Sequence, residues 1–175
     1  MEIPRIIPIL QISHRDVVKT KKFKRPTYIG DPINSVRIFN EKQVDELFIL
    51  DITATKEAKK PDYRLIEELA GECFMPLAYG GGISTIAEAQ QIFALGVEKI
   101  CLQSAAINEP ELVRRLADRF GSQSIVVSVD VKNNWLHGYR PYFASQDKTL
   151  ALPLEDWLSK IVSAGAGEIL LNSVE

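Results

Sequence analysis

The chain has 175 residues, of which 46% are hydrophobic and 25% are charged, and its formal net charge is −2. These proportions are typical of one soluble globular domain with a sizeable core, and the balanced charge gives no reason to expect a nucleic-acid partner. The two cysteines lack metal-type spacing, and no apolar run approaches the ~18 residues of a membrane span. We therefore expect a cytoplasmic protein that binds no membrane and needs neither a disulfide nor a metal.

Short apolar runs along the chain predict β-strands. Most of them lack the alternation of a strand with one wet face, and near-continuous apolar strands are typical of a parallel sheet covered on both faces. The runs span residues 5–12, 46–52, 76–79, 99–102, 124–131 and 168–172. The sequence therefore predicts a parallel sheet.

Segments with helical periodicity separate these runs. Asp31 before Pro32 is typical of a helix start, and Thr85 with Glu88 fits a capping box. Further helices are expected over 65–73, 108–121 and 154–162, and a hairpin is expected over 133–142. Alternating strands and helices indicate either an open doubly wound sheet or part of a (β/α)8 barrel.

A repeated pattern favours the barrel. Residues 96–106 and 165–175 each contain a glycine, a charged residue, an apolar run, an amide side chain and a serine, and residues 44–53 are a looser copy. Repeated βα units with polar residues at the carboxyl ends of the strands suit a (β/α)8 TIM barrel. Because such a barrel takes about 250 residues, we expect residues 1–175 to be a single barrel domain, truncated after strand six and incomplete at the C-terminus.

Polar residues stand at the carboxyl ends of the predicted strands, where α/β proteins place small-molecule sites. They are Gln11, Asp51, Gly80 to Gly82, Gln103, Ser104, Asp130, Asn172 and Ser173. A single polar strand end has no special meaning, but a full set in register indicates a site. The triple glycine lets the backbone approach a ligand and suits phosphate, although a tight turn uses the same residues.

Charged residues also precede four of the strands at their amino ends. Arg5, Glu46, Lys99 and Glu168 alternate in sign, so they either form a ring of ion pairs that closes the bottom of the barrel or remain isolated surface pairs. The segment after the first strand is basic and begins with Lys19. It favours an anionic substrate or is a solvated face.

Motifs along the whole chain resemble one known family. They include Arg5-Ile-Ile-Pro8, Val44-Asp-Glu-Leu47, Tyr79-Gly-Gly-Gly-Ile83, Phe120 to Asp130, and Gly165 to Leu171. The family is the cyclase subunit of imidazole glycerol phosphate synthase. The resemblance implies a (β/α)8 barrel of two related halves, no cofactor, and a heterodimer with a glutaminase subunit whose ammonia travels up through the barrel to a phosphate-bearing substrate.

The resemblance also implies roles for individual residues. Asp130 matches one of two catalytic aspartates, and Lys19 matches a loop lysine near the substrate. Gly82, Gln103 and Ser104 match the first phosphate site, where the family usually has an asparagine and a threonine at the last two positions. From their place at the strand ends, Gly81, Asp51 and Asn172 are expected to complete the substrate site. The ammonia gate at the tunnel entrance matches Arg5, Glu46, Lys99 and Glu168.

The most consequential departure from the family is at position 11. Gln11 replaces the other catalytic aspartate, and a glutamine forms hydrogen bonds but cannot shuttle a proton. The lysine-rich lid over residues 20–30 resembles paralogues associated with amidation of surface-glycan sugars. We therefore expect such an ammonia-using paralogue. The alternatives are an authentic histidine-pathway cyclase that tolerates Gln11, and a non-catalytic partner that only stimulates a glutaminase.

Overall fold

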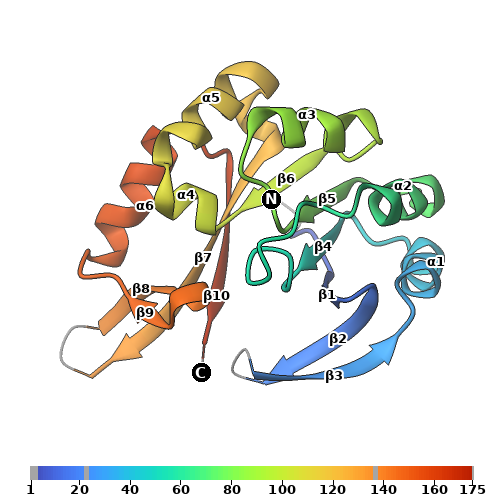
Figure 1. The fold of residues 1–175 in the computed structure, drawn as a ribbon, viewed down its shortest axis with the longest axis horizontal. Coiled ribbons are helices and arrows are strands. Elements are labelled where there is room, and N and C mark those ends of the chain that lie inside the picture. The colour runs from blue at the N-terminus through green and yellow to red at the C-terminus, as the bar shows by residue number, and fades with distance from the viewer. Residues whose placement is uncertain (1–3, 22–23, 136–137, 175) are drawn as a thin grey trace.

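The computed structural model describes residues 4–21, 24–135 and 138–174 (Figure 1). The strands are β1 (Ile9–Ser13), β2 (Asp16–Lys21), β3 (Lys24–Gly30), β4 (Leu47–Asp51), β5 (Leu77–Gly80), β6 (Lys99–Leu102), β7 (Ile125–Asn134), β8 (Gly138–Phe143), β9 (Lys148–Thr149) and β10 (Glu168–Ser173). The α-helices are α1 (Pro32–Lys42), α2 (Tyr63–Glu72), α3 (Ile86–Ala94), α4 (Ser104–Asn108), α5 (Pro110–Phe120) and α6 (Leu154–Ser163). Short 3-10 helices lie at Ser122–Ser124 and Ala144–Gln146.

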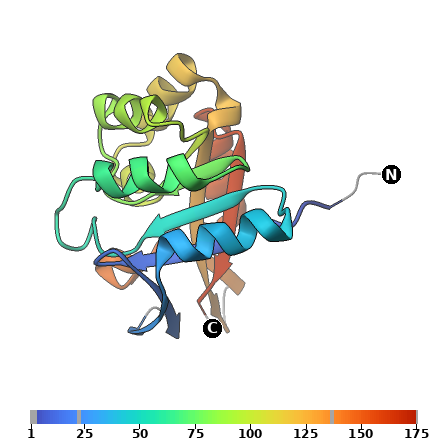
Figure 2. The same ribbon diagram turned by 90° about the vertical axis from the view of Figure 1, so that its right-hand side faces the viewer.

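The parallel strands of the sheet follow one another in chain order. The order is β1-β4-β5-β6-β7-β10, and every neighbouring pair in this series is parallel. A doubly wound sheet would instead reverse its order at a switch point. The helices lie along the outer side of the curved sheet (Figure 1), and the turned view shows α1, α2 and α3 one beside another (Figure 2). The parallel strands show no such reversal, so the doubly wound alternative is wrong. Their order is compatible with a (β/α)8 barrel.

Two antiparallel extensions continue the sheet beyond its parallel part. After β1 the chain forms the hairpin β2–β3, where the sequence predicted only a basic loop. Its β3 is almost wholly exposed, so it lacks the apolar signal of a buried strand. After β7 the chain turns back into β8 and β9, which confirms the hairpin predicted over 133–142. His137, expected in that hairpin, lies outside the described residues.

Local capping explains where several helices begin. The Asp31 side chain accepts a hydrogen bond from the backbone N–H of Asn34 at 2.8 Å, and Pro32 opens α1. Thr85 and Glu88 form the complete capping box that the sequence predicts for α3. Asp62 caps α2 in the same way, which the sequence analysis missed. None of the helices in the described residues has the length and hydrophobicity of a transmembrane span.

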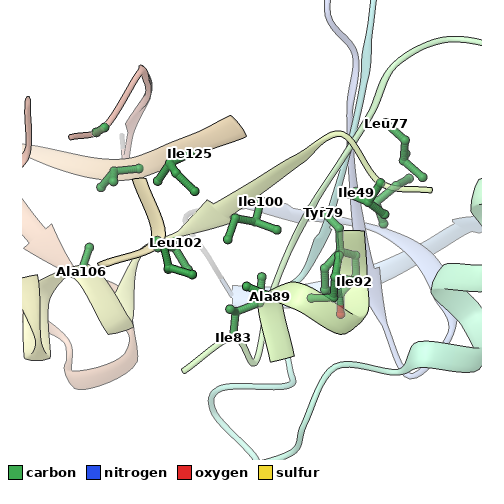
Figure 3. Packing of buried hydrophobic residues seen from close by; sticks show 14 of the residues in the cluster. Ile49, Leu77, Tyr79, Ile83, Ala89, Ile92, Ile100, Leu102, Ala106 and Ile125 are labelled. Carbon is green, nitrogen blue, oxygen red and sulfur yellow. The ribbon is translucent and has the colours of Figure 1, made fainter. Parts of the chain in front are cut away.

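The main hydrophobic core lies between the sheet and the outer helices. Strand residues such as Ile49 and Ile100 pack there against helix residues such as Ile92 (Figure 3). The other face of the sheet carries a smaller apolar cluster, which includes Phe48, Ala78, Cys101 and Val126. Adjacent residues of one strand therefore point into two apolar environments. This arrangement explains why the strands appear in the sequence as continuous apolar runs.

Candidate functional site

A cavity of about 460 Å³ lies where the parallel strands end at their carboxyl termini. Its lining includes the predicted catalytic and substrate-binding residues Gln11, Lys19, Asp51, Gly81, Gly82, Gln103, Ser104, Asp130 and Asn172. These residues come from β1, β2, β4, β7 and β10, from the segments that follow β5 and β6, and from the start of α4. The fold therefore brings residues from both ends of the chain to one cavity, as expected for the strand ends of a barrel.

Asp130 on β7 is held by two amide side chains. Gln103 Nε2 donates to Asp130 Oδ2 at 2.6 Å, and Asn172 Nδ2 donates to Asp130 Oδ1 at 3.1 Å. Asn172 is the register partner of Asp130 on β10. Burial raises the pKa of Asp130, although the hydrogen bonds from Gln103 and Asn172 oppose this shift. A carboxyl group with a raised pKa at a cavity wall is suited to proton transfer.

Gln103 and Ser104 follow β6 directly, since the strand ends at Leu102 as the apolar run 99–102 predicts. Neither residue lies on the strand itself, because Ser104 already opens the short helix α4, which the sequence did not predict. Gln103 already donates one N–H to Asp130, so its predicted contact with phosphate would use the other.

Asp51 has a local structural role besides lining the cavity. Its Oδ1 accepts hydrogen bonds from the backbone N–H groups of Thr53 and Ala54 at 2.9 and 3.0 Å, and from the Thr53 hydroxyl at 2.8 Å. These bonds hold the loop between β4 and α2, which contributes Thr55 to the cavity wall. Thr55 was not among the residues predicted from the sequence, since a threonine in a polar loop carries no distinctive signal.

The glycine loop after β5 has a backbone that only glycine adopts readily. Gly81 and Gly82 have φ angles of +126° and +70°. A Cβ atom on Gly82 would lie 2.8 Å from the Lys59 carbonyl oxygen, so the loop packs directly on the neighbouring backbone. The Gly82 N–H donates to Thr55 Oγ1 at 3.3 Å. The close approach suits the phosphate site that the sequence predicts here.

Gly82→Ala is expected to lower the free energy of unfolding by about 1–3 kcal/mol, because it adds a contact with backbone at a strained φ angle. Gly71→Ala is the matched control: Gly71 lies in α2 with nothing within 4 Å of its added Cβ, so alanine there should stabilise by about 0.5–1 kcal/mol. Urea unfolding measures both changes. Equal effects of the two substitutions would contradict the tight packing of the loop.

The four charged residues at the opposite ends of the strands form a closed ring. Arg5 contacts Glu46 and Glu168 at 3.3 Å each. Lys99 Nζ contacts Glu46 at 2.9 Å and Glu168 at 2.8 Å. The Glu46 side chain is only 1% exposed, whereas Arg5 is 53% exposed. The structure thus places all four residues together, and their role as an ammonia gate stays a prediction.

The ion pairs of the ring shift the pKa values of Lys99 and Glu168 in opposite directions. Burial alone would lower the pKa of Lys99, but its hydrogen bonds to Glu168 and Glu46 outweigh this effect and raise it. Burial alone would raise the pKa of Glu168, but its contacts with Lys99 and Arg5 together outweigh this effect and lower the pKa. Both shifts favour the charged forms, as expected for a network in which each cation bridges two carboxylates.

Metal ligation has no support in the described ranges 4–21, 24–135 and 138–174. They contain no group of three or more His, Cys, Asp or Glu side chains arranged to hold an ion. The polar side chains of the cavity are amides, hydroxyls, two lysines and two carboxyl groups.

Comparisons with known proteins agree with this architecture. The family model described as histidine biosynthesis protein matches residues 5–175. A Pseudomonas aeruginosa protein provisionally named imidazole glycerol phosphate synthase subunit hisF2 is 48% identical over 171 residues, which are 98% of this chain and 68% of that relative. A Leptospira interrogans protein provisionally named subunit HisF is 50% identical over 173 residues, with the same shares of the two chains.

A relative from Natranaerobius thermophilus, named imidazole glycerol phosphate synthase subunit HisF without qualification, is 38% identical over 171 residues. That match again covers 98% of this chain and 68% of the relative. Family model and relatives thus extend over nearly all of the sequence, including the strands that line the cavity. The chain therefore belongs to the histidine biosynthesis protein family, among the HisF-type subunits of imidazole glycerol phosphate synthase.

Proposed function

We propose that the protein is the ammonia-using synthase subunit of a glutamine amidotransferase complex, and that it is a paralogue acting on a surface-glycan sugar rather than in histidine biosynthesis. The observation that carries this proposal is the asymmetry of the cavity. One wall holds the buried carboxyl group of Asp130, while the family's second catalytic aspartate is replaced by the amide of Gln11. A reaction that needs proton transfer by two carboxyl groups is therefore not supported by Asp130 and Gln11.

The ion-pair ring and the cavity lie at opposite ends of the parallel strands, which supports a route for ammonia between them. A glutaminase partner docked over Arg5, Glu46, Lys99 and Glu168 would deliver ammonia at the amino ends of the strands. The inner sheet face contains apolar residues such as Cys101, which suit a small neutral molecule better than an ion. Partner and route both follow from the family resemblance together with this placement.

At the cavity we propose addition of ammonia to an electrophilic carbonyl carbon. The nitrogen forms the new bond to carbon, and the electron pair of the C=O double bond moves to oxygen. Asp130 takes a proton from the nitrogen and returns it to the oxygen, so that one carboxyl group balances the step. The backbone N–H of Gly81 and the hydroxyl of Ser104 would hold the phosphate of the substrate, and the Gly82 N–H would join them by exchanging its bond to Thr55 for one to the phosphate. Lys19 would contribute positive charge from β2.

The percentage sequence identities between this chain and its relatives also favour a paralogue. Relatives with provisional or numbered names, including hisF2 and the hisF3 of Vibrio vulnificus, are 45–50% identical to this chain. The relatives named HisF without qualification, from Natranaerobius thermophilus and Lactococcus lactis, are 38% and 42% identical. The chain is thus more similar to the provisionally named group.

Complementation of a bacterial strain that lacks its histidine-pathway cyclase tests this proposal. We expect the protein to fail, and Gln11→Asp also to fail, because the whole site is adapted to another acceptor. Growth with the unchanged protein would show an authentic cyclase, and growth only with Gln11→Asp would show a degraded one. In parallel, glutamate release by a partner glutaminase is measured; stimulation without any product from the barrel would favour a non-catalytic role.

A further inference from the structure

The amide of Gln11 is oriented by a neighbour on the adjacent strand. Thr20 Oγ1 donates a hydrogen bond to Gln11 Oε1 at 2.9 Å. Gln11 pairs with Val18 in the β1–β2 register, so Thr20, two residues further along β2, projects from the same face of the hairpin. Both Gln11 and Thr20 line the cavity, and their contact is partly buried.

This contact decides which atoms Gln11 offers to a ligand. A glutamine amide has one acceptor oxygen and two N–H donors. Thr20 already donates to the oxygen, whereas the amide nitrogen donates no hydrogen bond to any of the described residues. The two N–H groups are therefore the part of this amide that has no protein partner there. The wall at β1 therefore presents hydrogen-bond donors, whereas the wall at β7 presents the carboxyl group of Asp130.

We propose that Thr20 is a positioning residue that fixes Gln11 as a hydrogen-bond donor, and that the site consequently selects a substrate with a carbonyl oxygen at this wall. The inference rests on the proposed function and concerns how that site orients the carbonyl group of its substrate. Ammonia addition places negative charge on the carbonyl oxygen, and a fixed N–H donor stabilises that charge. Gln11 thus contributes hydrogen bonds where the family's aspartate would exchange protons.

The polarity of the site would change with the residue at position 11. A glutamate has the shape of glutamine but, when ionised, only accepts hydrogen bonds. Gln11→Glu would therefore repel a carbonyl oxygen and accept from a hydroxyl group. Loss of the Thr20 hydroxyl would have a milder consequence, since the amide could rotate and present either its oxygen or its nitrogen.

Two matched probes test this inference: ribulose 5-phosphate, an open-chain ketone, and ribitol 5-phosphate, the corresponding alcohol. Calorimetric titration of the full chain gives the ratio of the two dissociation constants. We expect the unchanged protein to prefer the ketone by about fivefold. Thr20→Val should bring the ratio close to one, Thr20→Ser should restore the preference, and Gln11→Glu should reverse it. Rescue by serine would not follow from a purely structural role of Thr20.

Thr27→Val is the control, because Thr27 is exposed on β3 of the same hairpin and lies outside the cavity lining. It should leave the ratio unchanged, and circular dichroism checks that each variant is folded. If Thr20→Val is folded and its ratio is unchanged, the inference is overturned, although the proposed phosphate site is not. If Thr20→Val is unfolded, the absence of a ketone preference in Thr20→Ser overturns the inference in the same way. Failure of the unchanged protein to bind either probe would overturn the phosphate site of the proposed function as well.

Discussion

Asp130→Asn is expected to abolish ammonia-dependent turnover and, at neutral pH, to raise the free energy of unfolding. Removal of a general acid–base group typically costs a factor of about 10²–10⁴ in rate, and no other carboxyl group of the cavity is buried as Asp130 is. The asparagine keeps the shape of the side chain. Gln103 or Asn172 can rotate its amide to present an oxygen to the new N–H group.

The stability gain has a defined pH dependence. Burial raises the pKa of Asp130, so the folded protein holds this proton at pH values where the unfolded chain has lost it. The contribution of the group to stability is therefore fully present below its ordinary pKa of 3.8 and is lost as the pH rises through the raised pKa. Asparagine does not titrate, so the advantage of the variant should grow with pH across this window.

Urea unfolding at a series of pH values measures this difference, and ammonium-dependent product formation measures the rate. Asp118→Asn is the control, since Asp118 is exposed on α5 and should alter neither quantity. Full turnover in Asp130→Asn would remove Asp130 from the mechanism. A variant that is less stable at every pH would mean that the two amide hydrogen bonds outweigh the cost of burying the charge.

Lys99→Met is expected to lower the free energy of unfolding by about 3–5 kcal/mol at neutral pH, because it leaves the buried carboxylate of Glu46 without its closest cation. Arg5 is more distant and more exposed, so it cannot replace Lys99. Glu46 Oε1 has no hydrogen-bond partner among the described residues, and the remaining charge would be poorly compensated. The double variant Lys99→Met with Glu46→Gln should recover most of the loss, since no unpaired charge remains.

The pH dependence of the unchanged ring follows from its pKa shifts. The contribution of Glu168 is present above its ordinary pKa of 4.5 and is lost as the pH falls through the lowered value. The contribution of Lys99 is present below its ordinary pKa of 10.5 and is lost as the pH rises through the raised value. Lys99→Met should therefore cost most between these limits and least in acid.

Arg64→Met provides the matched comparison for a surface pair. Arg64 contacts Glu68 at 3.1 Å on α2, and both side chains are largely exposed. Its removal should change stability by less than about 1 kcal/mol. Chemical denaturation measures the free energy of unfolding of the unchanged protein, the two single variants and the double variant. A loss in Lys99→Met no larger than in Arg64→Met would show that the ring is energetically equivalent to isolated surface pairs.

Local sequence was sufficient to predict the order of most elements and the residues of the cavity. Apolar runs marked the parallel strands because both faces of each strand are covered, and Thr85 with Glu88 marked the start of α3 because a capping box involves only neighbours in the chain. Polar residues at strand ends marked the cavity, since parallel strands bring their carboxyl ends to one edge. Asp130 and Gln11 were identified in this way.

Other features depend on pairs of residues that are distant in sequence. The choice between a barrel-type sheet and a doubly wound sheet required the strand order, because both folds have the same alternation of strands and helices. Strand β3 is almost wholly exposed and carries no apolar pattern, so the sequence did not reveal the hairpin, and the contact of Thr20 with Gln11 emerged only from the β1–β2 register. Closure of the ring depends on a lysine and a glutamate 69 residues apart. By itself, the sequence determined which residues reach the rim of the sheet; the tertiary structure decided which atoms they present, because hydrogen-bond direction is set by partners from other strands.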